Sequence, residues 1–212
     1  MRITANFDAG NIDVIDLENK ADIQLAIRPD VGGEFFQWFN FRLEGQVGEQ
    51  YVLNIMNAGE ASYLEGWENY QAVASYDRQH WFRLPTSYKD GKLTIIADLD
   101  YETIQIAYFA PYSYERHQDL LAAAQQHPLA TLEHLGETLD KRDLTLVKIG
   151  DDDTSKRSIW ITARQHPGET MAEWLVEGLM HSLLDSDNAT AKRLLDLSLI
   201  HISEPTRHAQ SS

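Results

Sequence analysis

The sequence predicts an N-terminal antiparallel β-sandwich over residues 1–112, followed by an α/β unit over residues 113–212. Three observations predict this order. Short apolar runs alternate with polar residues up to about Tyr112, the apolar spacing then becomes helical, and strand-like runs precede a further helical run in the remainder. An apolar fraction of 43% suits a chain of 212 residues with a buried core, so we expect folded domains.

The first half contains several short strands. The runs ADIQLAIR, FNFRL and TIQIAY each alternate large apolar side chains with polar or small ones, which is the period of a half-buried strand. Turn-forming residues separate the runs: Gly32-Gly33, Gly45, Asn57 with Gly59, Pro85 and Asp90-Gly91. Many short strands with this spacing favour an antiparallel sandwich.

The same half is rich in aromatic residues, in EFFQWFNF, EGWENYQ and SYDRQHWFRLP. Large aromatic side chains usually fill a core, and we expect that role here. The alternative is a stacking surface that binds sugars or peptides. Exposure of Trp67, Tyr76 and Trp81 would favour that alternative.

Helical and strand-like segments follow Pro111. Ser113 can cap a helix that Pro128 ends, with Leu120, Leu121 and Ala124 at helical spacing. ATLEHLGETL, DLTLVKIG and SIWITAR are then strand-like, and their short polar connections, DKR and DDDTSK, predict hairpins. A further helix covers GETMAEWLVEGLMHSLL, and a short one covers Asn188 to Leu197. The predicted apolar face of the longer helix comprises Met171, Trp174, Leu175, Gly178 and Leu179.

Charge and composition exclude several classes of function. The net charge of −15 repels phosphates and anionic membranes, so we expect neither nucleic acid nor a membrane as partner. The absence of cysteine excludes disulfides, thiolate nucleophiles and cysteine zinc sites, so a metal would need His, Asp or Glu. No secretory leader or membrane-spanning run is present, which predicts a cytoplasmic location. No feature specifies an oligomeric state.

His166 and Glu169 form the strongest candidate site, in the stretch ITARQHPGETMAEW. Catalytic zinc commonly takes three protein ligands drawn from His and Glu, and a tight turn can present residues three apart to one side. A strand end that opens onto a helix is also where α/β folds place ligands. The spacing alone favours a plain turn, because Pro-Gly is a common turn pair and Glu suits a helix start.

The residues that flank His166 and Glu169 indicate a family more specifically than the spacing of the two residues does. ITARQHPGETMAEWLVEGL resembles the first metal-binding segment of the zinc carboxypeptidases, in the cytosolic carboxypeptidase branch that includes bacterial members. YFAPYSYERHQDLL resembles the junction between the two domains of that branch, and LGETLDKRDLTLVKIG resembles the first strands of its catalytic domain. The resemblance extends from Met1 to about Asp196.

The resemblance implies that residues 113–212 are the first part of an α/β zinc-carboxypeptidase domain. It makes His166 and Glu169 the first two ligands of Zn²⁺, with a peptide or protein C-terminus as the substrate whose last peptide bond is hydrolysed. Gly168 stands where the digestive branch often has arginine, which again indicates the cytosolic branch. Arg164 belongs to the same sequence stretch, but the resemblance implies no role for it beyond a basic residue near the site. A solvated position at the end of a strand is an equally good interpretation of Arg164.

The resemblance also implies what this chain lacks. The family needs a third ligand, which is a histidine on a later strand, then arginine and asparagine for the substrate carboxylate, a tyrosine and a general-base glutamate. The stretch after Glu169 is too short to supply them, and His181, His201 and His208 are not credible replacements. We therefore expect no catalytic residue in this chain, and we expect the chain alone to be inactive.

The last segment departs from the family. LIHISEPTRHAQSS does not lead into the strand and asparagine-rich loop expected next, and LIHISEPTR resembles translated sequencing-adapter read-through. This predicts a non-native tail over about 197–212.

Two other readings remain open. One is a zinc amidoacylase of the aspartoacylase type, which also uses a His-x-x-Glu pair. The other is a non-catalytic β-sandwich that binds a peptide or glycan, with a vestigial zinc segment behind it.

Overall fold

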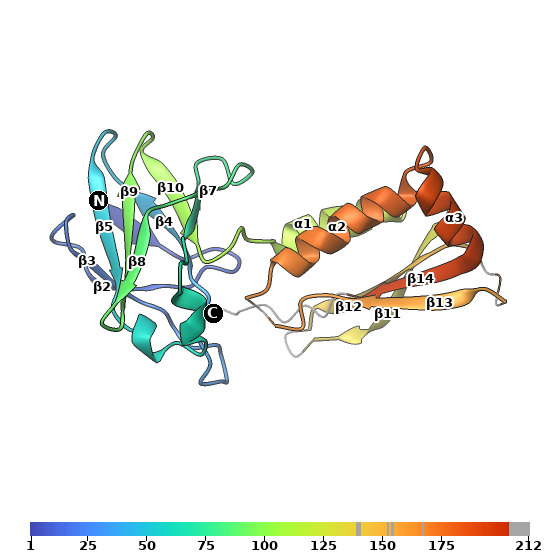
Figure 1. The fold of residues 1–212 in the computed structure, drawn as a ribbon, viewed down its shortest axis with the longest axis horizontal. Coiled ribbons are helices and arrows are strands. Elements are labelled where there is room, and N and C mark those ends of the chain that lie inside the picture. The colour runs from blue at the N-terminus through green and yellow to red at the C-terminus, as the bar shows by residue number, and fades with distance from the viewer. Residues whose placement is uncertain (139–140, 152, 154, 167, 204–212) are drawn as a thin grey trace. The chain divides into compact units, whose positions relative to one another are not determined.

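The computed structural model describes residues 1–203 except 139–140, 152, 154 and 167 (Figure 1). The described chain forms two compact units, which we call unit 1 (Met1–Pro111) and unit 2 (from Tyr112 onward). Each unit has its own hydrophobic core. The predicted order, a mostly antiparallel sandwich followed by an α/β unit, is confirmed.

Unit 1 contains two five-stranded sheets and two short 3₁₀ helices. The first sheet is antiparallel, in the order β1 (Arg2–Thr4), β4 (Asn40–Glu44), β10 (Thr103–Ala107), β6 (Val73–Ser75) and β7 (Phe82–Arg83). The second has the order β2 (Asp13–Asp16), β3 (Ile23–Ala26), β5 (Gln50–Ile55), β9 (Lys92–Asp98) and β8 (Thr86–Lys89). The β3–β5 pair is parallel and the other pairs of this sheet are antiparallel. The 3₁₀ helices are η1 (Ala58–Glu60) and η2 (Leu64–Trp67).

Alternating side chains from both sheets build the core of unit 1. Leu25 of β3, Phe41 of β4 and Ile106 of β10 are fully buried, as period-two strands with one apolar face require. The aromatic residues mostly fill this core. Trp67 is 2% exposed, and its indole N–H donates to the Ala58 carbonyl at 2.9 Å. The core-filling prediction is therefore confirmed for Trp67.

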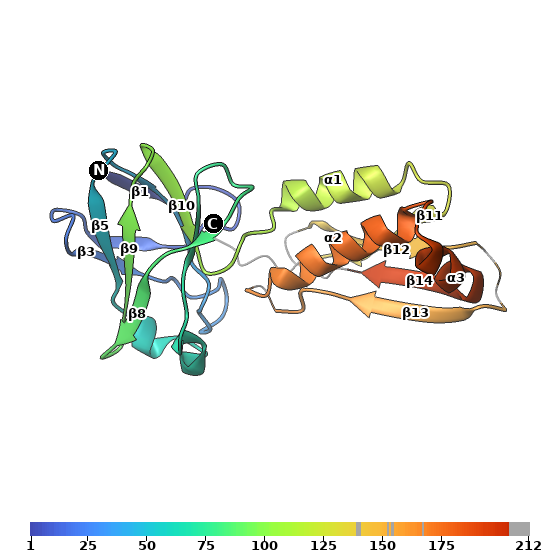
Figure 2. The same cartoon turned by 45° about the horizontal axis from the view of Figure 1, so that its top comes forward.

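Unit 2 is a four-stranded sheet with three helices over one face, as both views show (Figures 1 and 2). The strand order is β11 (Ala130–Glu137), β12 (Asp143–Ile149), β14 (Ser198–Ser203) and β13 (Arg157–Thr162). The helices are α1 (Tyr114–Ala124), α2 (Met171–Leu184) and α3 (Ala189–Leu197). Side chains cap two of them: the Ser113 hydroxyl accepts from the Arg116 N–H, and the Asn188 side chain accepts from two N–H groups of α3.

Two predictions about the last strands are wrong. Segments β12 and β13 do not form a hairpin, because β14 lies between them, antiparallel to β12 and parallel to β13. The parallel pair requires a crossover, and α2 and α3 supply it. Ser198–Ser203 is thus a strand, with Ile200 and Ile202 buried, although the sequence pattern predicted no strand there. The rest of the predicted tail, 204–212, lies outside the described residues.

The buried face of α2 also differs from the predicted one. Met171 and Leu175 are 45% and 72% exposed, whereas the buried residues of α2 are Glu173, Val176, Met180 and Leu183. Hydropathy selects the wrong face because the inward face carries a charged residue, Glu173. Within the part of the chain that the structure describes, no helix is long and apolar enough to cross a membrane.

Candidate metal-binding turn

The candidate ligands lie in the connection between β13 and α2. Both His166 and Glu169 are exposed. The Glu169 N–H donates to the His166 carbonyl at 3.0 Å, and the Ala172 N–H donates to the Glu169 carbonyl at 3.1 Å. A closed turn therefore carries both side chains at the start of α2. Pro167, which the sequence also places in this turn, is outside the described residues.

Arg164 lies just before the turn and is buried, with 1% of its surface exposed. Its Nη1 donates to Oε2 of Glu173, the third residue of α2, at 2.5 Å. The same nitrogen donates to the Tyr112 carbonyl at 3.1 Å. The explanation of Arg164 as a solvated strand end is therefore wrong, because a buried carboxylate and a carbonyl hold the guanidinium inside the fold.

A second ion pair joins α1 to α2 one turn further along. Arg116 donates to Glu177 through Nε at 2.8 Å and through Nη2 at 2.5 Å. Its guanidinium also lies 4.2 Å from the Trp174 ring centroid. Burial by itself would raise the pKa of Glu177, but the hydrogen bonds and charge of Arg116 lower that pKa below its usual value. This pair is partly exposed, unlike the Arg164–Glu173 pair.

The donor set of the turn suits zinc but is incomplete among the described residues. Imidazole nitrogen and carboxylate oxygen are ordinary zinc donors. In the described part of the chain, no group of three His, Cys, Asp or Glu side chains is placed to hold a metal. His181 is exposed on α2. His201 is buried on β14 and stacks on the Trp160 ring at 4.3 Å between centroids.

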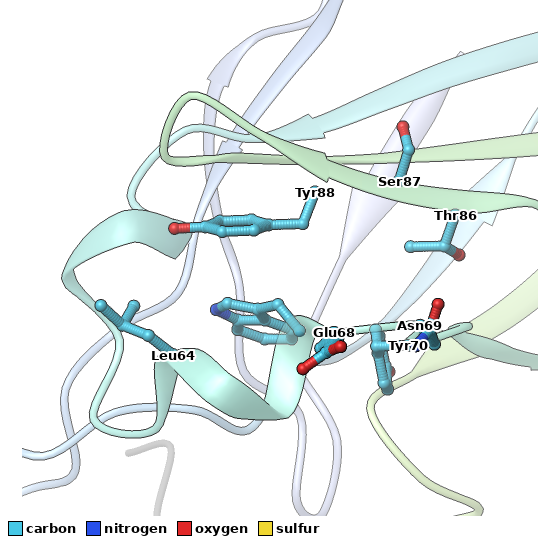
Figure 3. Close-up of a pocket in the computed structure, with 8 residues that line it drawn as sticks. Leu64, Glu68, Asn69, Tyr70, Thr86, Ser87 and Tyr88 are labelled. Carbon is cyan, nitrogen blue, oxygen red and sulfur yellow. The ribbon is translucent and has the colours of Figure 1, made fainter.

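Unit 1 has a separate pocket with a volume of about 500 Å³ (Figure 3). The rings of Trp67 and Tyr88 lie beside this pocket, with 6.4 Å between their centroids and 31° between their planes. The Thr86 hydroxyl already bonds backbone groups of Ala72 and Leu84. The pocket lining comprises Leu64, Trp67, Glu68, Asn69, Tyr70, Thr86, Ser87 and Tyr88. This lining contains one side chain of a type that commonly binds zinc, Glu68.

Sequence reasoning missed the pair of Arg164 and Glu173. A signal was present, because Glu173 lies three residues before Val176 and seven before Met180, on the face that is buried. A glutamate on that face needs a cationic partner. The sequence does not show which cation is near enough, since Arg164 belongs to a different element.

Comparison with known proteins identifies both units. Residues 3–109 match the family described as the cytosolic carboxypeptidase N-terminal domain, and residues 117–204 match the family described as zinc carboxypeptidase. An uncharacterised protein of Zymomonas mobilis is 41% identical, over 95% of this chain and 52% of that protein. Human cytosolic carboxypeptidase 6 is 28% identical, over 85% of this chain and 40% of that protein. The chain thus spans about half the length of the curated relatives it matches, or less.

Solved structures agree with these relatives. A metallo-carboxypeptidase from Burkholderia cenocepacia is 46% identical, with a TM-score of 0.92 over 95% of this chain and 55% of that chain. A metallo-carboxypeptidase from Pseudomonas aeruginosa, solved with (2-guanidinoethylmercapto)succinic acid, is 39% identical. Its TM-score is 0.90 over 96% of this chain and 54% of that chain.

Proposed function

This chain belongs to the zinc carboxypeptidase family, in the branch with a cytosolic carboxypeptidase N-terminal domain, and we propose that His166 and Glu169 are two of its zinc ligands. The observation that carries the proposal is the closed turn at the start of α2, which holds an exposed imidazole and an exposed carboxylate three residues apart. The Arg164–Glu173 pair supports this turn from the buried side.

The proposed reaction is hydrolysis of a C-terminal peptide bond by a zinc-dependent metallocarboxypeptidase. Zinc supplies polarisation of a carbonyl and a lowered pKa for water when it is bound. His166 would contribute a neutral imidazole nitrogen and Glu169 a carboxylate oxygen to hold the ion. The turn restricts the backbone that carries both side chains, so less conformational freedom would be lost when the metal binds.

The same family supports a proposal for the substrate and for the location. We propose that the substrate is a peptide or protein C-terminus, because the matched family is that of carboxypeptidases. A cytoplasmic location is supported by relatives named cytosolic carboxypeptidases. In domain terms, 1–112 would be the N-terminal β-sandwich domain and 113–212 the first part of the catalytic domain.

We further propose that the 212-residue chain by itself binds zinc weakly and does not hydrolyse peptides. Two ligands leave zinc without the third protein ligand that catalytic sites of this type use. Efficient release of C-terminal residues by the purified chain, abolished by a chelator, would contradict this part of the proposal.

The ligand assignment is tested by zinc titration calorimetry on the purified chain and on single variants. We expect His166→Ala and Glu169→Ala each to weaken zinc binding by about tenfold or more, since each removes a direct ligand. His181→Ala is the matched control, because His181 is exposed on the adjacent helix and outside the turn. Unchanged zinc affinity in His166→Ala would reject the site.

A further inference from the structure

We infer that Arg164 and Glu173 are a positioning pair, which fixes the turn carrying His166 and Glu169 in the geometry that binds metal. This inference deepens the proposed function and rests on it. Neither residue is assigned as a ligand. Their role is to hold the two ends of the ligand turn together from inside the fold.

Arg164 and Glu173 stand on either side of the candidate ligands in the chain. Arg164 comes two residues after the last residue of β13, and Glu173 is in the first turn of α2. The ligands His166 and Glu169 lie between them. A contact of 2.5 Å between Arg164 Nη1 and Glu173 Oε2 therefore joins both ends of the segment that carries the ligands. Holding both ends restricts the conformations of the turn between them.

Arg164 also contacts a third segment of unit 2, at Tyr112. The same Nη1 atom donates to the Tyr112 carbonyl, just before the cap of α1. The Tyr112 ring meets the Trp174 ring edge to face at 5.1 Å between centroids. Trp174 follows Glu173 directly in α2. Three segments of unit 2 thus meet at the Arg164 guanidinium: the connection after β13, the start of α2, and the chain just before α1. The candidate ligand turn is continuous with the first two of these segments.

The buried pair of Arg164 and Glu173 is energetically demanding. Both side chains are 1% exposed, and burying two charges costs desolvation energy that their attraction does not always repay. Arg164 also adopts a positive φ of 51°, which is unfavourable for a residue with a side chain. Two apolar residues of similar volume would fill the same space at lower cost. Packing alone therefore does not explain the pair, whereas directed hydrogen bonds between three segments do.

The location of Glu173 also suits this role. It is the third residue of α2, where the helix dipole favours a negative charge. The Glu173 carboxylate accepts a hydrogen bond from Arg164 at this position. Arginine suits the other side because its planar guanidinium donates in several fixed directions, which a lysine ammonium does not do.

The test is a set of four purified chains titrated with zinc and with cobalt(II), whose visible absorption reports coordination geometry. Besides the wild type, they are Arg164→Lys, the double variant Arg164→Met/Glu173→Met, and the control Arg116→Met/Glu177→Met. The control removes a more exposed ion pair, which joins α1 to α2 one turn further along α2 than Glu173. Circular dichroism melting establishes that each chain is folded.

We expect the zinc dissociation constant of Arg164→Met/Glu173→Met to rise by about tenfold, as loss of supporting contacts around metal ligands usually does. The double variant should fold, because an apolar pair can replace a buried ion pair at little cost. Arg164→Lys keeps the charge, so it should recover part of the affinity and part of the cobalt absorption. The control should bind zinc like the wild type.

The outcomes separate this inference from the proposed function. A wild-type chain whose zinc binding does not depend on His166 would reject the ligand assignment itself. Wild-type zinc affinity and cobalt absorption in the folded double variant would reject the positioning role alone. If the double variant did not fold, Arg164→Lys decides, because unchanged zinc affinity and cobalt absorption in that folded variant would also reject the role.

Discussion

The two units bury polar groups for different purposes. In unit 1 the buried Asn11 amide donates to the Arg28 and Trp38 carbonyls at 3.0 and 2.9 Å, which joins neutral groups to backbone. In unit 2 the buried polar contact beside the candidate site is the charged pair of Arg164 and Glu173. A neutral amide is sufficient to hold loops of a sandwich. A buried ion pair costs more, and its presence next to the candidate ligand turn is the observation behind the positioning role proposed above.

The largest expected change in the free energy of unfolding comes from removing an aromatic side chain from the core of unit 1. Trp67→Ala should lower the free energy of unfolding of unit 1 by about 4 kcal/mol, because a fully buried indole is replaced by a cavity. Phe35→Ala is the control, since Phe35 is 73% exposed and should change stability by less than about 0.5 kcal/mol. Urea unfolding followed by circular dichroism measures both. Equal losses in the two variants would show that Trp67 is not a core residue.

The next effect concerns the ion pair of unit 2. Arg164→Met alone should destabilise unit 2 by about 3 kcal/mol, because it leaves the Glu173 carboxylate buried without its partner. Adding Glu173→Met should recover most of that loss. A double-mutant cycle in urea measures the coupling between the two residues. A coupling free energy near zero would show that the buried charged pair does not stabilise unit 2.

The smallest effect is a pH dependence in unit 2. Burial, with a contribution from the charge of Lys148, lowers the pKa of His201 below its usual value. The folded state therefore favours the neutral ring. The contribution of His201 to the free energy of unfolding is fully present above its unfolded-state pKa of about 6.5. This contribution is lost as the pH falls through the lower pKa of the folded state. We expect a lower thermal midpoint at pH 5 than at pH 7.5.

His201→Phe is the variant that isolates this dependence. Phenylalanine keeps an aromatic ring against Trp160, with which His201 stacks at 13°, but it does not titrate. The difference in midpoint between the two pH values should therefore be smaller in the variant. His134→Phe is the control, because the side chain of His134 is 58% exposed. An unchanged pH dependence in His201→Phe would assign the effect to other groups.

Local pattern predicts most elements of this fold. The period-two runs identify strands β3, β4 and β10, the Ser113 cap identifies where α1 begins, and the helix predicted from Asn188 to Leu197 corresponds to α3. These features depend on neighbouring residues in the chain. The candidate ligands His166 and Glu169 are likewise found from one contiguous phrase, and the family that this phrase resembles is confirmed by the match of residues 117–204 to the zinc carboxypeptidases.

The sequence by itself therefore determined the order of the elements, the family and the candidate ligand turn. Only the tertiary structure decided that β14 lies between β12 and β13, which face of α2 is buried, and that Arg164 lies inside the fold. The reason is physical. Strand and helix patterns arise from residues a few positions apart, whereas strand order and burial of a charge depend on contacts between distant segments. Arg164 is buried because Glu173 and the Tyr112 carbonyl meet it in space.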